Sequence, residues 1–305
     1  MSSTGVDAQT PEGPVADGGS QARAVDDDVA VDALVEVLEE AERTGADPAP
    51  EDRAAGDFWA LLRPTTQSRI GLGRAGDSLS TRHVLELKAA HASARDAVHD
   101  PLPVAEFAAR VGDVGLGAPV VVTSRARDRG EYLRRPDLGR EPAELDEILG
   151  GEADLVVVLA DGLSPRALVD HGAELLAALV AEFDGRWTLA PPVIATQARV
   201  ALGDHIAAAS GASTVLVLIG ERPGLSVADS LGIYLTHRPQ PGRTADSDRN
   251  CISNIHPPDG LSYAQAARVC ASLVDGARSS GRSGVTLKDT SRTALGAAGA
   301  AAALD

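Results

Sequence analysis

STVLVLIGERPGL, residues 213–225, is the stretch that decides the fold of this chain. Thr214 to Ile219 is an unbroken apolar run rich in β-branched residues, too short for a helix, and a glycine ends it. Such a run is typical of a strand that is buried on both faces, as in a parallel sheet covered by helices. Glycines and a proline then break the backbone and leave Glu221 and Arg222 in a loop at the carboxyl end of the strand, where open α/β sheets bind their ligands.

The composition predicts a globular protein with an acidic tail. The chain has 305 residues, 44% of them apolar and 24% charged, which is ordinary for a protein of one large domain or two smaller ones. Residues 1–56 hold 14 acidic residues against 3 basic ones, so −11 of the net charge of −16 lies there and −5 remains for the rest of the chain. The negative balance argues against a nucleic-acid partner.

Cysteine usage and hydropathy exclude further classes. Two cysteines, Cys251 and Cys270, give no disulfide framework, and no Cys/His cluster has the spacing of a metal site. The chain begins without the basic and apolar regions of a secretory signal, and no apolar run approaches the roughly 18 residues of a membrane span. We therefore expect a reduced cytoplasmic protein with no metal site and no membrane segment.

Both ends of the chain are predicted to be flexible. Residues 1–56 are rich in small and acidic residues and are predicted to be a disordered tail. Within the tail, a stripe of four aliphatic residues from Val31 to Leu38 predicts a short amphipathic helix. That helix would dock on a partner or pack weakly on the chain's own body, and the sequence leaves both open. Residues 291–305, rich in Ala and Gly, are predicted to be a second flexible tail.

Residues 57–115 are predicted to form a small helical domain, with its main helix over 82–98. Gly71, Gly73 and Gly76 match the G-x-G-x-x-G pattern of dinucleotide-binding sites. That pattern needs a strand before it and a βαβ unit around it, and the residues before it form no strand pattern. We interpret it as a tight loop rather than as a nicotinamide or flavin site.

Residues 116–290 are predicted to form a Rossmann-like domain. Expected strands are 118–123, 155–160, 189–195, 214–219, 232–236 and, at an edge, 284–288. Expected helices are 165–183, with Ser164 as its cap and Pro165 as its first residue, 199–210, and a helix that Ser262 caps and that ends near 278. Repeated alternation of strand and helix predicts an α/β fold with a doubly wound, mostly parallel sheet.

Three segments should converge at one edge of that sheet: those after 195 and after 220, and residues 249–258. A carboxylate at Glu221 repels phosphate and suits a ligand rich in N–H or O–H groups. Arg222, Ser253, Asn254 and backbone groups would supply complementary donors and acceptors. An equally open alternative is that Glu221 and its neighbour Arg222 only pair locally and hold the loop.

Cys251 has two possible roles. Beside Arg249 its pKa could be lowered, which would make it a nucleophile, but no base is placed for it and 250–255 reads as a turn. A packed thiol that contacts a ligand is the favoured interpretation. The chain contains no recognisable triad, metal site or acid/base dyad, which suits a subunit that binds a cofactor while another chain performs the chemistry.

The chain resembles the light chain of ethanolamine ammonia-lyase over about residues 57–290. Six ordered blocks carry the resemblance: RIGLGRAGDSLSTR, EYLRRPDLGR, LADGLSPRA, ARVALGDHI, GERPGLS and RNCISNIHP. Six blocks in order are far more specific than any one motif.

The resemblance implies a helical N-terminal part, a Rossmann-like domain and a hetero-oligomer with a larger TIM-barrel chain. Adenosylcobalamin would lie between the two chains, and homolysis of its cobalt–carbon bond would begin the conversion of ethanolamine to acetaldehyde and ammonia, with the substrate held largely by the large chain. The Asp-x-His-x-x-Gly motif of histidine-ligated cobalamin domains is absent, since Asp170 and His171 are adjacent. The cofactor would therefore keep its own dimethylbenzimidazole as lower ligand.

By the same resemblance, the cobalamin contacts fall on Val200, Glu221 and Cys251, and this chain carries no catalytic residue. Secondary candidates for the cofactor are Arg222, Tyr234 and Asn254; Arg69, Arg74 and the arginines of 134–140 are assigned to the large-chain interface. Tethered helices target the family's enzymes into bacterial microcompartments, so encapsulation is a hypothesis for the tail. The competing interpretation is a non-enzymatic, Rossmann-like ligand-binding module.

Overall fold

The computed structural model describes residues 58–289. The chain divides into two compact units, Met1–Ala60 and Leu61–Asp305, and the elements named below belong to the second. In chain order these are η1 (Arg63–Thr65), α3 (Thr81–His99), α4 (Val104–Gly112), β1 (Val120–Thr123), α5 (Arg129–Arg134), η2 (Leu138–Arg140), β2 (Leu155–Ala160), α6 (Pro165–Phe183), β3 (Val193–Thr196), α7 (Leu202–Ser210), β4 (Thr214–Gly220), β5 (Leu231–His237), η3 (Asp246–Asp248), β6 (Asn250–Ile255) and α8 (Tyr263–Ser280). The predictions for 1–56 and 291–305 lie outside the described residues.

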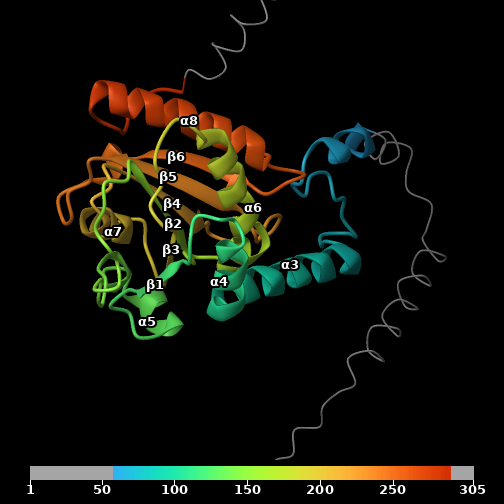
Figure 1. The fold of residues 1–305 in the computed structure, drawn as a ribbon. Helices are drawn as coiled ribbons and strands as arrows, with labels where there is room; N and C mark the ends of the chain where they lie inside the picture. The colour runs from blue at the N-terminus through green and yellow to red at the C-terminus, as the bar shows by residue number, and fades with distance from the viewer. Residues whose placement is uncertain (1–57, 290–305) are drawn as a thin grey trace, which may run out of the picture. The chain divides into compact units, whose positions relative to one another are not determined.

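The described strands form one six-stranded sheet in the order β1-β3-β2-β4-β5-β6 (Figure 1). β1, β3, β2 and β4 are parallel, as predicted. β5 runs antiparallel to β4, and β6 antiparallel to β5. The change of direction follows from the connection 221–230, which contains no helix and is too short to carry a parallel crossover. The result is a mixed α/β sheet with a parallel part and an antiparallel edge.

Helices cover the sheet from both faces because the strands are apolar on both sides. Along β2 the residues at 155, 157 and 159 join the core cluster that contains α6 and α8. The alternating residues at 156, 158 and 160 join the cluster that contains α7. Every residue of β2 and β4 is buried, as a strand between two layers of helices requires.

The carboxyl end of β4 is closely packed, and glycine is needed there. A Cβ built on Gly220 would overlap with the carbonyl oxygen of Ser164, at the start of α6. The Ser164 hydroxyl accepts a hydrogen bond from the backbone N–H of Ala167 at 3.2 Å and donates one to the carbonyl oxygen of Ala228 at 2.8 Å. The predicted cap of the 165–183 helix is therefore confirmed, and the same hydroxyl ties the loop after β4 to that helix.

Two strand predictions were wrong. Residues 250–255, interpreted as a turn, form edge strand β6, which buries Ile252 and Ile255 on one side and exposes polar residues on the other. Residues 284–288, predicted as an edge strand, form no strand, and Val285 is 65% exposed. This segment instead covers the edge of β6, because the side-chain amide of Asn250 donates to the carbonyl oxygens of Gly284 and Leu287, each at 3.1 Å.

The helices before the sheet pack on α6. Phe107 and Val111 of α4 belong to the same core cluster as α6, whereas α3 buries only Ala97. The glycines at 71, 73 and 76 all have positive φ, and no strand precedes them in residues 58–69, which confirms a tight loop there. Within the described part of the chain, no helix is both long and apolar enough to cross a bilayer.

Candidate functional site

An open strip of the sheet lies beside α7. α7 packs on β2 and β4, while α8 covers the opposite face of β5 and β6. Tyr234 of β5 faces the α7 side and is directly opposite Cys251 of β6, so the two side chains lie on the same face. Tyr234 is half-buried and Cys251 is exposed. We call these two residues, with Glu221 at the end of β4, the open strip.

A β-bulge brings the polar end of β6 to Glu221. Ser253 and Asn254 both lie opposite Gly232, because the register shifts between Leu231 and Ile233. The bulge gives Asn254 a φ of 66°, in the left-handed region that asparagine tolerates better than most residues. Its backbone N–H then donates to Oε2 of Glu221 at 3.3 Å.

The Glu221 carboxylate is held through one oxygen only. Oε2 also accepts a hydrogen bond from the Ser230 hydroxyl at 2.7 Å, and the Glu221 backbone N–H donates to the Ser230 carbonyl oxygen at 2.9 Å. A Cβ built on Gly232 would lie 2.9 Å from Oε1, so the missing side chain there leaves room for the carboxylate. No described residue donates a hydrogen bond to Oε1. Glu221 therefore helps to hold its loop and still presents one oxygen as an acceptor.

The other two side chains of the strip are neutral at physiological pH. Desolvation raises the pKa of Tyr234 to about 12, with smaller contributions from Cys251 and Glu221. Partial desolvation also raises the pKa of the Cys251 thiol; the hydrogen bond with Tyr234 opposes this, and the Glu221 charge adds to it. A thiol that is harder to ionise than usual is a poor nucleophile, which favours the interpretation of Cys251 as a contact residue.

A buried ion pair fixes the strip to α7. Both guanidinium Nη atoms of Arg249 donate to the carboxylate of Asp204 on α7, each at 2.7 Å, and Nη1 also donates to the Thr236 hydroxyl at 2.9 Å. The two charged side chains are almost completely buried. This pair sets the start of β6, and therefore Cys251, against β5 and α7. Sequence reasoning missed it because the two residues are 45 positions apart and belong to no motif.

Val200 is positioned by a second buried carboxylate. Asp161 follows β2 and accepts hydrogen bonds from the backbone N–H groups of Gln197 at 2.7 Å and Ala198 at 3.0 Å. Burial raises the pKa of Asp161, and these two bonds oppose the rise. The Tyr132 hydroxyl donates to the Ala198 carbonyl oxygen at 3.0 Å. The loop after β3 is thereby fixed, and Val200 packs against the same core cluster as Tyr234.

The structure brings some of the predicted site residues together and leaves others apart. The structure brings together Glu221, Asn254, Tyr234 and Cys251, whereas Arg222 makes no ion pair with any described residue. Within residues 58–289 no three His, Cys, Asp or Glu side chains are placed to hold a metal ion.

The arginines assigned to an interface have mixed surroundings. Arg69 Nη1 donates to the Leu225 carbonyl oxygen at 2.9 Å and so supports the loop after β4. Arg135 is exposed and pairs with Asp137 at 2.7 Å. Their role toward a partner stays a prediction.

Comparison with known proteins gives one consistent answer. Residues 56–288 match the family model of the ethanolamine ammonia-lyase light chain. The chain is 67% identical over 249 residues to the ethanolamine ammonia-lyase small subunit of Rhodococcus erythropolis, covering 82% of this chain and 96% of that protein. It is 45% identical over 250 residues to the small subunit of Ralstonia nicotianae (79% and 92% covered) and 48% identical over 246 residues to that of Xanthomonas campestris pv. campestris (76% and 88% covered).

Proposed function

The chain belongs to the ethanolamine ammonia-lyase light-chain family, and we propose that it is the small subunit of an adenosylcobalamin-dependent ethanolamine ammonia-lyase. In this proposal the open strip contacts the cofactor at the interface with a larger, TIM-barrel subunit. The sheet with helices on both faces is then the Rossmann-like, doubly wound domain of the family, preceded by a small helical domain.

The observation that carries the proposal is the half-satisfied carboxylate of Glu221. Ser230 and Asn254 hold Oε2, and Oε1 remains available over the backbone of Gly232. The rim of the corrin ring carries amide groups, whose N–H donors suit such an oxygen. Tyr234 and Cys251 add a neutral, largely apolar surface next to it. These residues therefore fit the edge of a corrin rather than a phosphate or a metal ion.

Each of the three proposed cofactor contacts, Val200, Glu221 and Cys251, has a task in this proposal. Glu221 accepts a hydrogen bond from a corrin amide and fixes the rotation of the ring, and Val200 and Cys251 pack against the ring and exclude water. When bound, adenosylcobalamin supplies a weak cobalt–carbon bond whose homolysis starts the conversion of ethanolamine to acetaldehyde and ammonia. This chain contributes binding, orientation and shielding from solvent, and no catalytic residue is assigned to it.

Co-expression tests the proposal. The chain is purified with and without its candidate large subunit, and adenosylcobalamin binding and ethanolamine deamination are measured for each chain alone and for the mixture. Deamination that requires both chains is the expected result. If the chain binds a ligand alone and forms no complex, it is a non-enzymatic binding module instead.

We also propose that the acidic tail directs the enzyme into a bacterial microcompartment. The support is the predicted stripe of aliphatic residues between Val31 and Leu38. Deletion of residues 1–45 should then change cellular location while the deamination rate of the complex stays the same. Unchanged location and unchanged partner binding would exclude this role.

A further inference from the structure

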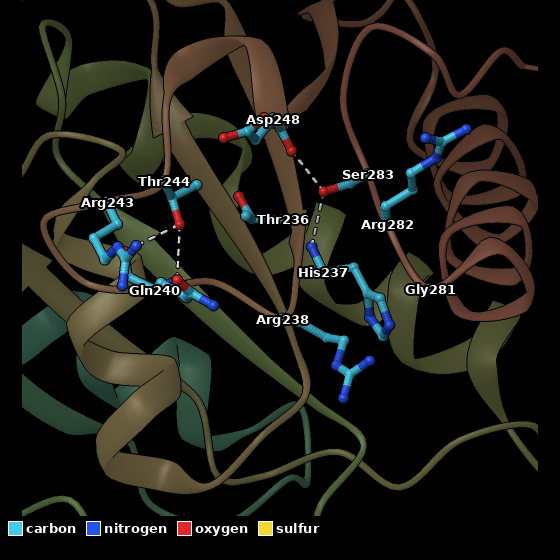
Figure 2. Close-up of a pocket in the computed structure, with 10 residues that line it drawn as sticks. All are labelled: Thr236, His237, Arg238, Gln240, Arg243, Thr244, Asp248, Gly281, Arg282 and Ser283. Atoms are coloured by element: carbon cyan, nitrogen blue, oxygen red, sulfur yellow. Dashed lines mark hydrogen bonds between the residues drawn. The ribbon is translucent and has the colours of Figure 1, made fainter.

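A pocket lies at the end of β5 that is farther from Glu221. It has a volume of about 380 Å³ and is lined by residues between 236 and 248 and between 281 and 283, among them Arg238, Arg243, Arg282 and Asp248 (Figure 2). His237 pairs with the first residue of β4, whereas Leu231 pairs with the last. Six residue steps along β5 lead from Leu231 to His237, so His237 lies about 20 Å from the end of β5 that is next to Glu221.

The walls of this pocket are tied together by hydrogen bonds. The Ser283 hydroxyl accepts from the backbone N–H of His237 at 3.0 Å and donates to the carbonyl oxygen of Asp248 at 2.6 Å. These bonds join the end of β5, the segment before β6 and the turn after α8. A third wall is closed by Thr244, whose hydroxyl accepts from the Gln240 backbone N–H at 2.7 Å. The pocket is therefore formed before any ligand arrives.

Three arginines line the pocket without a partner. In Figure 2, Arg243 lies at the left of the pocket, Arg282 at the upper right and Arg238 below, and their guanidinium groups point in different directions. None of the three guanidinium groups makes an ion pair or a hydrogen bond with a described residue. The one acidic lining residue, Asp248, instead accepts a hydrogen bond from the backbone N–H of Ala245 at 2.9 Å. This is unexpected in a chain with 44 acidic and 28 basic residues, in which most other described arginines are paired.

The backbone at one of these arginines is also unusual. Arg238 has a φ of 53°, and its N–H donates to the carbonyl oxygen of Ser213 at 2.7 Å. A non-glycine residue in the left-handed region is strained, and this conformation persists only when the surrounding structure holds it in place. Here that conformation places an arginine on the rim of a pocket.

We propose that this arginine pocket binds the phosphate group of a small phosphorylated molecule. Three guanidinium groups against one carboxylate give the lining a net charge of about +2, which matches the charge of roughly −1.5 to −2 on a phosphate monoester. A carboxylate ligand would leave one of those charges uncompensated. The volume exceeds that of a phosphate ion, so the remaining space takes the organic part of the ligand.

The pKa of His237 should respond to the charge of a ligand bound in this pocket. Burial lowers its pKa, and Arg278 and Arg238 lower it further. A bound phosphate dianion would favour the imidazolium form and raise this pKa again. The pocket lies at the other end of β5 from Glu221, and the inference does not depend on the cofactor contacts.

The test is calorimetric titration of the full-length chain, in complex with its large subunit, with inorganic phosphate, 5′-AMP and acetate. Saturable binding of 5′-AMP, stronger than that of acetate, is expected. Arg282→Gln and Arg238→Asn should each weaken it about tenfold, as expected for a lost charge-assisted contact; asparagine is chosen at 238 because it tolerates a positive φ. Arg125→Gln, whose exposed side chain pairs with Glu141 elsewhere, is the matched control.

Each outcome decides the proposal. If inorganic phosphate binds as tightly as 5′-AMP and both are weakened by the variants, the pocket is a site for free phosphate, and the proposal that it takes a phosphorylated organic molecule is overturned. No saturable binding of either compound at millimolar concentration would overturn the proposal. Binding that survives both variants would also overturn it, because the phosphate would then lie elsewhere. If Arg238→Asn does not fold, Arg243→Gln replaces it in the same comparison.

Discussion

A methyl group at position 232 should displace the carboxylate on which the proposed cofactor contact depends. In Gly232→Ala the new Cβ would lie 2.9 Å from Oε1 of Glu221 and 3.5 Å from its Cγ. A separation below 3.0 Å forces one of the groups to move, and the residue lies in β5, where alanine is otherwise tolerated. The Glu221 side chain is the movable group.

The cost of that movement follows from the bonds that hold the carboxylate. Displacing Oε2 breaks the hydrogen bond from the Ser230 hydroxyl, and displacing Oε1 removes the acceptor offered to the cofactor. A hydrogen bond to a charged group contributes about 1.5–3 kcal/mol, which corresponds to roughly a tenfold to hundredfold loss of cofactor affinity. Absorbance titration of the two-subunit complex with adenosylcobalamin measures this loss.

Two controls make the result specific. Gly151→Ala adds the same methyl group where nothing lies within 4 Å of the built Cβ, so it should leave Kd unchanged. In a Glu221→Ala background, Gly232→Ala should have no further effect, because the two changes act on the same contact. Wild-type affinity in a folded Gly232→Ala complex would refute the reasoning, and so would full additivity with Glu221→Ala.

Three further predictions follow from the same region. Glu221→Gln keeps the shape but removes the charge, so cofactor affinity should fall about tenfold, as for a charge-assisted bond replaced by a neutral one; an unchanged titration curve would show that the charge is not used. Arg249→Met leaves the Asp204 carboxylate buried without its partner and should lower the free energy of unfolding in urea by about 3–5 kcal/mol, whereas a wild-type midpoint would contradict the role of this pair. Because its raised pKa lowers the thiolate fraction, Cys251 should react with iodoacetamide more slowly at pH 8 than an unstructured cysteine, and faster as the pH rises. Cys270 is buried and should stay unmodified until the chain unfolds. Equal reaction rates for the two cysteines would refute this prediction.

The parallel part of the sheet was predictable from sequence because its strands are continuous apolar runs. The run 214–219 forms β4 and the run 155–160 forms β2 with the predicted bounds almost unchanged. Strands that are buried on both faces give a strong signal in a single sequence. The Ser164-Pro165 start of α6 was equally clear, because capping and proline placement depend on local chemistry.

The antiparallel edge was not predictable in the same way. β6 has one face on α8 and one face open, and its bulge places two polar residues in succession, so its pattern resembles a turn. Residues 284–288 show the reverse: they were predicted as a strand but form none, and the Asn250 side chain donates to the carbonyl oxygens of Gly284 and Leu287. In both cases long-range contacts decide the conformation, and sequence periodicity does not report them.

The candidate site was also predictable only in part. That Glu221 and Asn254 would meet followed from the rule that ligands bind at the carboxyl ends of parallel strands. The sequence carries no signal for the residues that support them. Ser230 bonds to Glu221, Gly232 leaves room for its carboxylate, and the buried Arg249–Asp204 pair holds the start of β6. These roles arise only when distant segments pack together.

The most direct test of the central claim is adenosylcobalamin titration of the purified two-subunit complex with Glu221→Ala. Glu106→Ala, which removes an exposed carboxylate on α4, is the matched control. We expect Glu221→Ala to bind the cofactor at least about tenfold more weakly, while the subunits still co-purify and the control stays at wild-type affinity. Unchanged affinity for Glu221→Ala would contradict the claim that the open strip contacts the cofactor.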